Sequence, residues 1–516
     1  MTSIGNRGRV LGVAAGAAAV LAVVAAQPAA SAAPDASATP AASGTVRLSA
    51  APLGMNIPPW NALYTNAGSG AILQRQLKNA HVSQLHYGGG QYADEYDWQT
   101  NTDIVKCPST AVTEYKAKCA TYNALDFALF SKKARAISAQ SFITVNYGSG
   151  TPAEAWGEVK QAKKSGQQVG LWEIGNEGYG CWEDNNWLSA APEHYKGYRP
   201  TINSTCPMVK EGVPAGMETM AKSYAANAGR FMAAMKAANP SALIGVPWAF
   251  DGSVLGASVA GNTEWNSTVL TADRKYIGFV DVHWYPEEYG GITGAGANPT
   301  AEQVIQSVYQ IPKEYASVRK QLAGYRLPGA KIVVGETGVS YLATDTACTA
   351  VGALFAAGDA LEWLSAGAYS VDWWTMNGYG NTGKTCSHPD EGMFTSGSKP
   401  IDESPYLGYL LAGALARPGA RLTALALPSG QASSVLAFQS VLANGKTAVL
   451  LINTSTSTPQ TVSFRSSLAG KLAKVSYTAA NQNSFATKTT TTAATAAAVS
   501  RGVLLPAESM TLLEES

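Results

Sequence analysis

Residues 170–177 read Gly-Leu-Trp-Glu-Ile-Gly-Asn-Glu, a short apolar run that ends in glycine, asparagine and a carboxylate. A second run of the same design, Lys-Ile-Val-Val-Gly-Glu, occupies 331–336. Short apolar runs bounded by turn residues are typical of strands that are buried on both faces of a parallel sheet. We therefore interpret both segments as buried strands. Each carries a glutamate at its C-terminal end, Glu177 in the first and Glu336 in the second.

Six more apolar, β-rich runs share this pattern, at 53–57, 82–87, 142–147, 243–248, 279–285 and 369–375. Segments rich in Ala, Leu, Lys and Arg separate many of them, at 67–80, 127–138, 217–238, 301–322 and 349–366. Strands that alternate with helices pair in parallel through helical crossovers. Eight such units are the number found in a (β/α)8 barrel. The sequence thus predicts an α/β fold with a (β/α)8 TIM barrel over residues 46–417.

The pattern changes after residue 417. Short β-rich runs are separated by Ser, Thr, Gly and Asn turns, and they include 448–453, 461–464, 475–478 and 510–513. No convincing helix lies between them, which favours a C-terminal antiparallel β-sandwich domain over 418–516. The run Val46–Ala50, which precedes the first barrel strand, could add a strand to this domain.

The first residues resemble a sorting signal. Arg7 and Arg9 precede an almost purely apolar run that extends to Ala26, and Ala30-Ser31-Ala32 fits a small-residue cleavage site. These features predict a signal peptide over 1–32, followed by a disordered Ala/Pro/Ser/Thr leader over 33–45. A membrane anchor is the alternative, because the apolar run is nearly long enough to span a bilayer. We expect a secreted, extracellular protein.

Charge and motif content exclude several classes of function. Lys and Arg number 37 against 36 Asp and Glu, and there is no long basic run, so neither nucleic acid nor a membrane surface is expected as a partner. The five histidines include no H-E-x-x-H motif, and no Gly-x-Ser-x-Gly elbow occurs. We therefore expect a monomer that holds no metal and needs no cofactor.

The placement of the two glutamates indicates a reaction. Glu177 ends the fourth predicted strand and Glu336 the seventh, so their carboxyl groups can face each other across the C-terminal mouth of a barrel. Hydrolysis of a glycoside needs such a pair, one acid to protonate the leaving oxygen and one carboxylate to attack carbon or activate water. All twelve tryptophans lie between Trp60 and Trp374, and aromatic faces at a barrel mouth suit sugar rings.

These residues resemble clan A of the glycoside hydrolases. The resemblance implies that Glu177, which follows Asn176, is the general acid/base and that Glu336 is the nucleophile of a retaining mechanism. It also implies that Asn176 binds the 2-hydroxyl of the sugar. Tyr285 matches the position that contacts the nucleophile, and Trp374 matches the tryptophan that stacks on the sugar.

Within the clan, the loop Gly88–Trp98 is similar to one in the α-L-arabinofuranosidases and their β-xylosidase and β-glucuronidase relatives. Those families often carry an arginine near the end of the second strand, where this chain has Leu85-His86-Tyr87. We expect His86, Tyr92, His283 and Trp284 to join the substrate-binding residues named above.

We expect different roles for the other acidic residues near these motifs. Glu173 lies four residues before Glu177, and we expect it to be a buried carboxylate in a hydrogen-bond network below the site. Asp94, Glu95 and Asp97 could bind substrate hydroxyls or simply be solvated.

The sequence therefore predicts a secreted retaining glycoside hydrolase that acts on plant or microbial polysaccharide. Two alternatives remain, a transglycosylase on the same scaffold and a non-catalytic carbohydrate-binding protein. The sugar, its linkage and the choice between exo and endo action are left open by these residues.

The six cysteines provide a test of export. An even number in an exported chain favours disulfides, and nearest-neighbour pairing, one of fifteen possibilities, would join Cys107–Cys119, Cys181–Cys206 and Cys348–Cys386. Exported protein should begin near residue 33 and show no free thiol when denatured. Reduction should lower its melting temperature, because removal of a native disulfide costs about 2–5 kcal/mol. Retained residues 1–32 or six free thiols would contradict this expectation.

Overall fold

A computed structural model describes residues 44–103, 124–180, 207, 211, 215–250, 262–286, 300–339, 349–377, 392–428, 430–431, 433–478 and 490–516. These residues all lie in one compact unit, Pro40–Ser516. The predicted signal peptide, most of the predicted leader and all six cysteines lie outside the described residues. Within the described ranges, no helix is long and apolar enough to cross a membrane.

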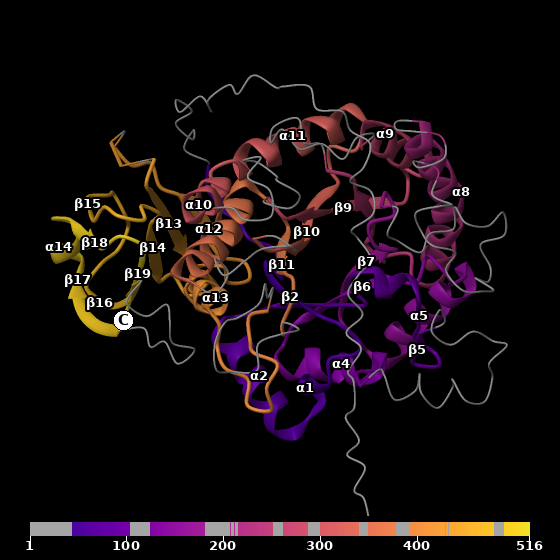
Figure 1. The fold of residues 1–516 in the computed structure, drawn as a ribbon, viewed down its shortest axis with the longest axis horizontal. Helices are drawn as coiled ribbons and strands as arrows, with labels where there is room; N and C mark the ends of the chain where they lie inside the picture. Colours follow the sequence, from indigo (N-terminus) through magenta and orange to yellow (C-terminus); the bar gives the residue numbers. More distant parts are fainter. Residues whose placement is uncertain are drawn as a thin grey trace, which may run out of the picture. The chain divides into compact units, whose positions relative to one another are not determined.

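Eight parallel strands close into a barrel in the order β10-β11-β2-β3-β6-β7-β8-β9 (Figure 1). Their bounds are β2 Leu53–Ile57, β3 Gln84–Tyr87, β6 Gln140–Val145, β7 Val169–Ile174, β8 Ile244–Trp248, β9 Ile277–Trp284, β10 Lys331–Thr337 and β11 Ser370–Trp373. Each corresponds to one of the eight runs recognised in the sequence, so the predicted (β/α)8 barrel is confirmed.

Helices surround the barrel and connect its strands (Figure 1). They are α1 Ala62–Thr65, α2 Ala67–Asn79, α4 Phe127–Ala136, α5 Pro152–Ser165, α8 Ala215–Ala238, α9 Asn262–Ala272, α10 Ala301–Val308, α11 Ile311–Gly324, α12 Ala350–Ala366 and α13 Ser404–Leu415. A short 3-10 helix, η1, spans Gln91–Asp94, and a small hairpin pairs β4 Tyr96–Asp97 with β5 Thr102–Asp103.

Local sequence signals explain where several helices begin and end. Thr151 and Glu154 form a capping box at the start of α5, Pro152 occupies its first turn, and Gly166 ends it in a left-handed conformation. The segment predicted as one helix over 301–322 is two helices, because Pro312 stands in the first turn of α11 and lacks the N–H that a continuous helix needs.

The inside of the barrel changes character along its axis. Phe142, Leu171, Phe279 and Val333 form a separate apolar cluster, and β6 and β9 are not neighbours, so these side chains meet inside the barrel. Side chains two residues further along a strand point to the same side. After Phe142, Leu171 and Phe279 those residues are Thr144, Glu173 and Asp281, which makes the next layer toward the C-terminal mouth polar.

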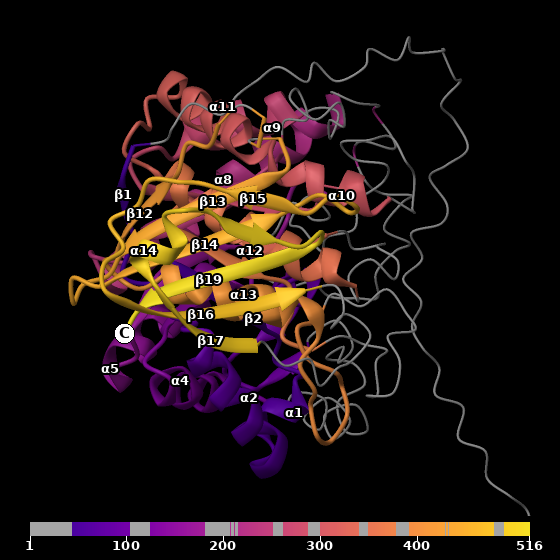
Figure 2. The same cartoon turned by 90° about the vertical axis from the view of Figure 1, so that its left-hand side faces the viewer.

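The C-terminal part is a seven-stranded antiparallel sheet in the order β1-β12-β13-β14-β19-β16-β17. Its strands are β1 Val46–Arg47, β12 Arg421–Ala424, β13 Val435–Val441, β14 Thr447–Asn453, β19 Ser509–Glu515, β16 Lys471–Thr478 and β17 Thr490–Thr495. The N-terminal strand β1 pairs with β12, as Val46–Ala50 led us to expect. The predicted antiparallel sheet is thereby confirmed (Figure 2).

The two faces of this sheet are covered differently. Leu436, Phe438 and Leu450 belong to the same core cluster as α12 and α13. The opposite face, with Val449 and Leu451, belongs to a smaller cluster with the two-stranded sheet of β15 Gln460–Val462 and β18 Val503–Leu505 and with α14 Ala496–Val499. The two layers of the predicted sandwich are thus unequal, because the second has two short strands.

The close approach of α12 and α13 depends on glycine. A Cβ added at Gly408 would lie 2.1 Å from the carbonyl oxygen of Ala353, a backbone atom that cannot move aside. We expect Gly408→Ala to destabilise the protein by about 1–3 kcal/mol, as overpacked cores do. Gly324→Ala is the control, since a Cβ there meets nothing within 4 Å and alanine favours the helix. Urea denaturation of both variants measures the difference, and equal stabilities would contradict this packing.

Candidate active site at the barrel mouth

The loop after β7 presents Glu177 through two unusual backbone conformations. Gly175 has a φ of +69° and Glu177 a φ of +34°, so the chain turns sharply as it leaves the strand. A Cβ on Gly175 would lie 2.7 Å from the Cβ of Tyr147, which leaves room for glycine alone. Glycine at position 175 is therefore a requirement of this turn.

Asp94, in η1, holds that turn in place. One carboxylate oxygen accepts hydrogen bonds from the backbone N–H groups of Tyr147 at 3.2 Å and Gly148 at 3.1 Å. The other accepts the N–H of Asn176 at 3.1 Å. Asp94 is fully buried, so it joins the ends of β6 and β7 and does not reach substrate hydroxyls, the role we considered for it. Glu95 is also buried, and Asp97 binds its own turn through Gln99 and Thr100.

Glu336 points into the mouth because of a β-bulge. In the ladder of β10 with β9, Val334 pairs with Val282 and Glu336 pairs with His283, so Gly335 is an extra residue. Without the bulge, strict alternation would turn Glu336 to the outside. A Cβ on Gly335 would lie 2.1 Å from Oδ2 of Asp281, which explains why glycine occupies the bulge.

Different donors hold the two glutamates. The hydroxyl of Tyr285 donates to Oε2 of Glu336 at 2.8 Å, and the N–H of Gly90 donates to Oε1 at 3.3 Å. Glu177 accepts from the hydroxyl of Tyr179 at 3.1 Å and lies 2.9 Å from Nδ1 of His283. One oxygen from each glutamate and one nitrogen of His283 lie within 4.8 Å of one another. The predicted pair does meet.

His283 is the cation between the two glutamates. Its Nδ1 is 3.4 Å from Oε2 of Glu336, and its Nε2 is 3.5 Å from Oδ2 of Asp281. Burial alone would lower the pKa of His283, but Glu336, Asp281 and Glu177 outweigh burial and raise it well above its ordinary value. An imidazolium with both N–H groups directed at carboxylates fits these contacts.

Burial also acts on Glu336. It raises the pKa of Glu336 to about 7; His283 and the Tyr285 hydroxyl lower this pKa, while the charge of Glu177 raises it. Two carboxyl groups this close share one proton over a range of pH, so the pair offers one acid and one carboxylate together.

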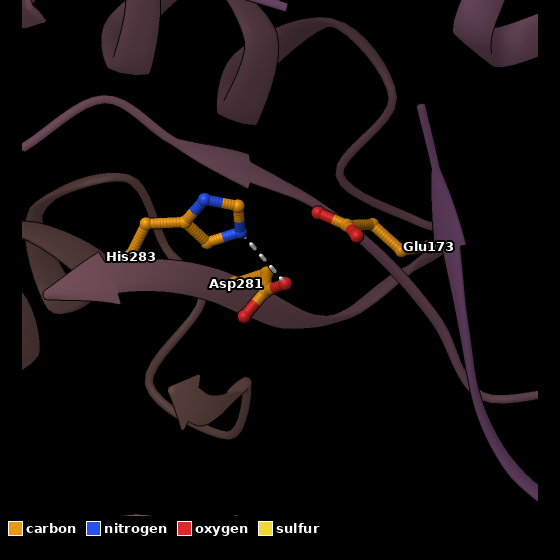
Figure 3. Close-up of side chains that lie close together, drawn as sticks. All are labelled: Glu173, Asp281 and His283. Atoms are coloured by element: carbon orange, nitrogen blue, oxygen red, sulfur yellow. Dashed lines mark ion pairs between the residues drawn. The ribbon is translucent and has the colours of Figure 1, made fainter. Parts of the chain in front are cut away.

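Beneath this pair lies a second polar layer. Figure 3 shows Glu173, Asp281 and His283 directed toward one another, with an ion pair between the last two. Oε2 of Glu173 accepts the hydroxyl of Thr144 at 3.0 Å, and Glu173 is fully buried, as the sequence led us to expect. Burial first, and then the charge of Asp281, raises the pKa of Glu173 well above its ordinary value.

His86 belongs to this lower layer, which corrects our expectation that it binds substrate. It is 0% exposed and stacks on Phe142 with ring centroids 3.8 Å apart. Its Nδ1 lies 3.1 Å from the Gly335 carbonyl oxygen and its Nε2 lies 2.7 Å from the Thr144 hydroxyl, and a neutral ring donates to only one of these two groups. Burial lowers the pKa of His86 to about 4, so it is a neutral structural imidazole.

Trp284 is also corrected. It follows His283, so alternation turns it outward, where it packs edge-on against Trp363 of α12 and is 1% exposed. Trp374 does line the mouth side, because Cβ atoms on Gly89 and Gly90 would each lie 2.8 Å from its ring. The predicted sugar-stacking tryptophan therefore lies beside the loop whose Gly90 reaches Glu336.

The remaining predicted positions lie near the same loop. Tyr92 packs edge-on against Trp60 with centroids 4.8 Å apart and is nearly buried. Asn176 is buried beside Glu177.

Four groups that take part in the site were not predicted from the sequence. Asp281 lies two residues before His283, and Tyr179 lies two residues after Glu177. Both neighbours were singled out in the sequence, so the spacing could have indicated Asp281 and Tyr179 as well. Asn56, whose amide donates to the carbonyls of Gly335 at 2.8 Å and Trp373 at 3.3 Å, carried no local signal. The N–H of Gly90 carried none either.

Among the residues that the structure describes, two groups of side chains could hold a cation, Glu173 with Asp281 and His283, and Glu177 with His283 and Glu336. They share one imidazole, so an ion in either group would compete with the imidazolium for the same carboxylates.

No family model and no curated protein matches the sequence. Solved structures do match the fold. A family 51 α-L-arabinofuranosidase from Bifidobacterium longum has a TM-score of 0.65 at 15% identity, over 92% of this chain and 97% of its own. The Thermotoga maritima α-L-arabinofuranosidase in complex with arabinose has a TM-score of 0.63 at 15% identity, over 92% and 98%. A 4-O-α-L-rhamnosyl-β-D-glucuronidase from Fusarium oxysporum has 0.58 at 16%, over 92% and 99%.

At these identities the likeness establishes the fold, a TIM barrel with an antiparallel sheet. The solved structures named above are arabinofuranosidases and a glucuronidase, so the resemblance seen in the sequence is confirmed at the level of the fold.

The role of Asp94 in holding the Glu177 turn can be tested by stability. Asp94→Asn replaces a carboxylate oxygen by an amide that cannot accept the backbone N–H groups it faces. We expect a loss of about 1.5–3 kcal/mol in the free energy of unfolding, the range for hydrogen bonds to charged groups. Asp126→Asn is the control, because Asp126 caps α4 through Leu129 and asparagine caps equally well. If both variants unfold at the same denaturant concentration, Asp94 does not have this role.

Proposed function

We propose that this chain is a retaining glycoside hydrolase. The observation that carries the proposal is the pair of strand-end glutamates, whose oxygens lie within 4.8 Å and which have different hydrogen-bond donors. Retaining glycosidases keep their carboxyl groups about 5–5.5 Å apart, whereas inverting enzymes leave about 6.5–9.5 Å for a water. The short gap favours double displacement.

In the first step, Glu336 attacks the anomeric carbon and the glycosidic bond to the leaving oxygen breaks. Glu177 gives its proton to that oxygen, so an alcohol departs and a glycosyl ester of Glu336 remains. The resemblance seen in the sequence assigns Glu336 as the nucleophile, and the Tyr285 hydroxyl and the Gly90 N–H can stabilise it as the attacking carboxylate.

In the second step, Glu177 takes a proton from water as the oxygen of that water attacks the anomeric carbon. The ester bond to Glu336 breaks, the sugar is released with its original configuration, and Glu177 is again protonated. The imidazolium of His283 faces one negative carboxylate in each state, Glu336 in the free enzyme and Glu177 in the ester.

We propose α-L-arabinofuranosides of plant or microbial polysaccharide as the first substrate class. Two of the solved structures with this fold are α-L-arabinofuranosidases, and one of them was solved with arabinose. A glucuronidase has the same fold, so glucuronides belong in the same test. Xylosides, galactosides and glucosides join them because the sequence leaves the sugar open. The N-terminal segment supports action outside the cell.

A panel of p-nitrophenyl glycosides and polysaccharides, with product identification, tests the class of sugar. Release from the arabinofuranoside alone supports the proposal. Preference for another glycoside would change the proposed substrate and leave the proposed mechanism in place. A parallel series with added acceptor sugar distinguishes transfer to sugar from transfer to water. Binding to polysaccharide without bond cleavage would favour the non-catalytic alternative.

Removal of either glutamate should abolish turnover while the fold survives. General acid/base catalysis contributes about 10²–10⁴-fold, so Glu177→Ala should lose at least that much and Glu336→Ala no less. Azide should restore Glu336→Ala by forming an azido sugar of inverted configuration, and Glu177→Ala by forming one of retained configuration. Glu218→Gln, an exposed change on α8, is the control. Near-normal activity of Glu336→Ala would overturn the mechanism.

A further inference from the structure

The layer beneath the two glutamates contains more acid than the reaction uses. Glu177, Glu336, Asp281 and Glu173 surround the single imidazole of His283. Among the residues that the structure describes, every ion pair here involves His283. Four carboxylates against at most one positive charge would be costly in a buried site, and buried groups avoid that cost by taking up protons.

The contacts decide which lower carboxyl carries a proton. Oδ1 of Asp281 accepts the N–H of Gly335 at 2.6 Å, and Oδ2 faces Nε2 of His283, so Asp281 is stabilised as a carboxylate. Glu173 accepts one hydroxyl, that of Thr144. Oε1 of Glu173 and Oδ2 of Asp281 are both buried without a hydrogen-bond partner among the described residues. A proton on Glu173, shared with Asp281, would satisfy both.

We propose that Glu173 is a neutral carboxylic acid that donates its proton to Asp281 and thereby positions the Asp281 carboxylate against His283. The chain Glu173–Asp281–His283 then delivers one imidazolium N–H to the pair above it (Figure 3). Glu173 touches no substrate and acts through Asp281 and His283, so it is a positioning residue. This role rests on the proposed function.

Every neighbouring element agrees with a neutral Glu173. From β6 and β3 it meets the Thr144 hydroxyl and, behind it, the neutral imidazole of His86. On α8, the Tyr224 hydroxyl donates to the carbonyl of Ile174 and not to Glu173, and burial raises the pKa of Tyr224 well above its ordinary value. Strand β8, Ile244–Trp248, brings no titratable side chain. Within the described ranges, the charged groups that act on Glu173 are Asp281 and His283 of β9.

Stability as a function of pH tests the protonation without any substrate. A carboxyl whose pKa is raised in the folded state loses stability as pH rises above its unfolded value of about 4.3, because the unfolded chain ionises first. Glu173→Gln keeps a donor toward Asp281 and an acceptor for Thr144 but cannot ionise. We expect this variant to melt like the wild type near pH 5 and at a higher temperature near pH 8. Glu218→Gln controls for the change of a surface glutamate.

A lower melting temperature for Glu173→Gln at both pH values would overturn the proposal, because it would mean that an ionised Glu173 is needed. A chelator that lowers the melting temperature of the wild type but not of Glu173→Gln would also overturn the proposal. That result would mean that a bound cation, and not a proton, neutralises Glu173. Because melting needs no activity, an inactive protein would count against the proposed function alone.

The pH profile of an active enzyme gives the second readout. The kcat/KM profile of Glu173→Gln should rise and fall at the same pH values as that of the wild type, because glutamine still offers a donor toward Asp281. Asp281→Asn removes an anion that keeps His283 protonated, so the basic limb should move to lower pH, with kcat falling more than KM changes. A profile shifted equally by both substitutions would show that Glu173 is charged in the working enzyme, and the proposal would fail.

Discussion

The hydrogen bond from the Gly335 N–H to Asp281, 2.6 Å long, is the contact on which the mouth of the barrel depends. It anchors the bulge in β10, and the bulge turns Glu336 to the same side as His283. The carbonyl of Gly335 in turn accepts the Asn56 amide and faces His86, so three other strands converge on the backbone of this one residue. The carboxylate that holds this peptide also faces His283, which couples the backbone geometry to the charge of the site.

Two polar layers separate the chemistry from the apolar floor of the barrel. The upper layer contains the glutamate pair and is partly open, while the lower layer, with Glu173, Asp281 and His86, is closed to solvent. In the lower layer burial dominates, so charge there is limited and each polar group has one orientation. This division allows the upper layer to change protonation during a reaction while its support stays fixed.

The sequence was sufficient for the eight strands, because fully buried parallel strands are continuous apolar runs bounded by glycine and proline. It also identified Glu177 and Glu336 by their places at strand ends. It could not show why Glu336 faces inward, because a bulge adds one residue that alternation does not count. The sequence also does not give the direction of each side chain. Trp284 and His86 were therefore expected to bind substrate, but both are buried. Asp94 was ambiguous, since its three N–H partners come from two distant strand ends that only the fold brings together.

The barrel and the C-terminal sheet also share one apolar core. Gly358 of α12 approaches the Leu436 side chain of β13 so closely that a Cβ there would lie 3.1 Å from it, and Tyr309 bonds Thr454 at 2.8 Å. The first strand, β1, precedes the barrel in the chain and completes the sheet that follows it. The C-terminal sheet is therefore not a separate module, and we expect the barrel and the sheet to unfold together in one cooperative transition.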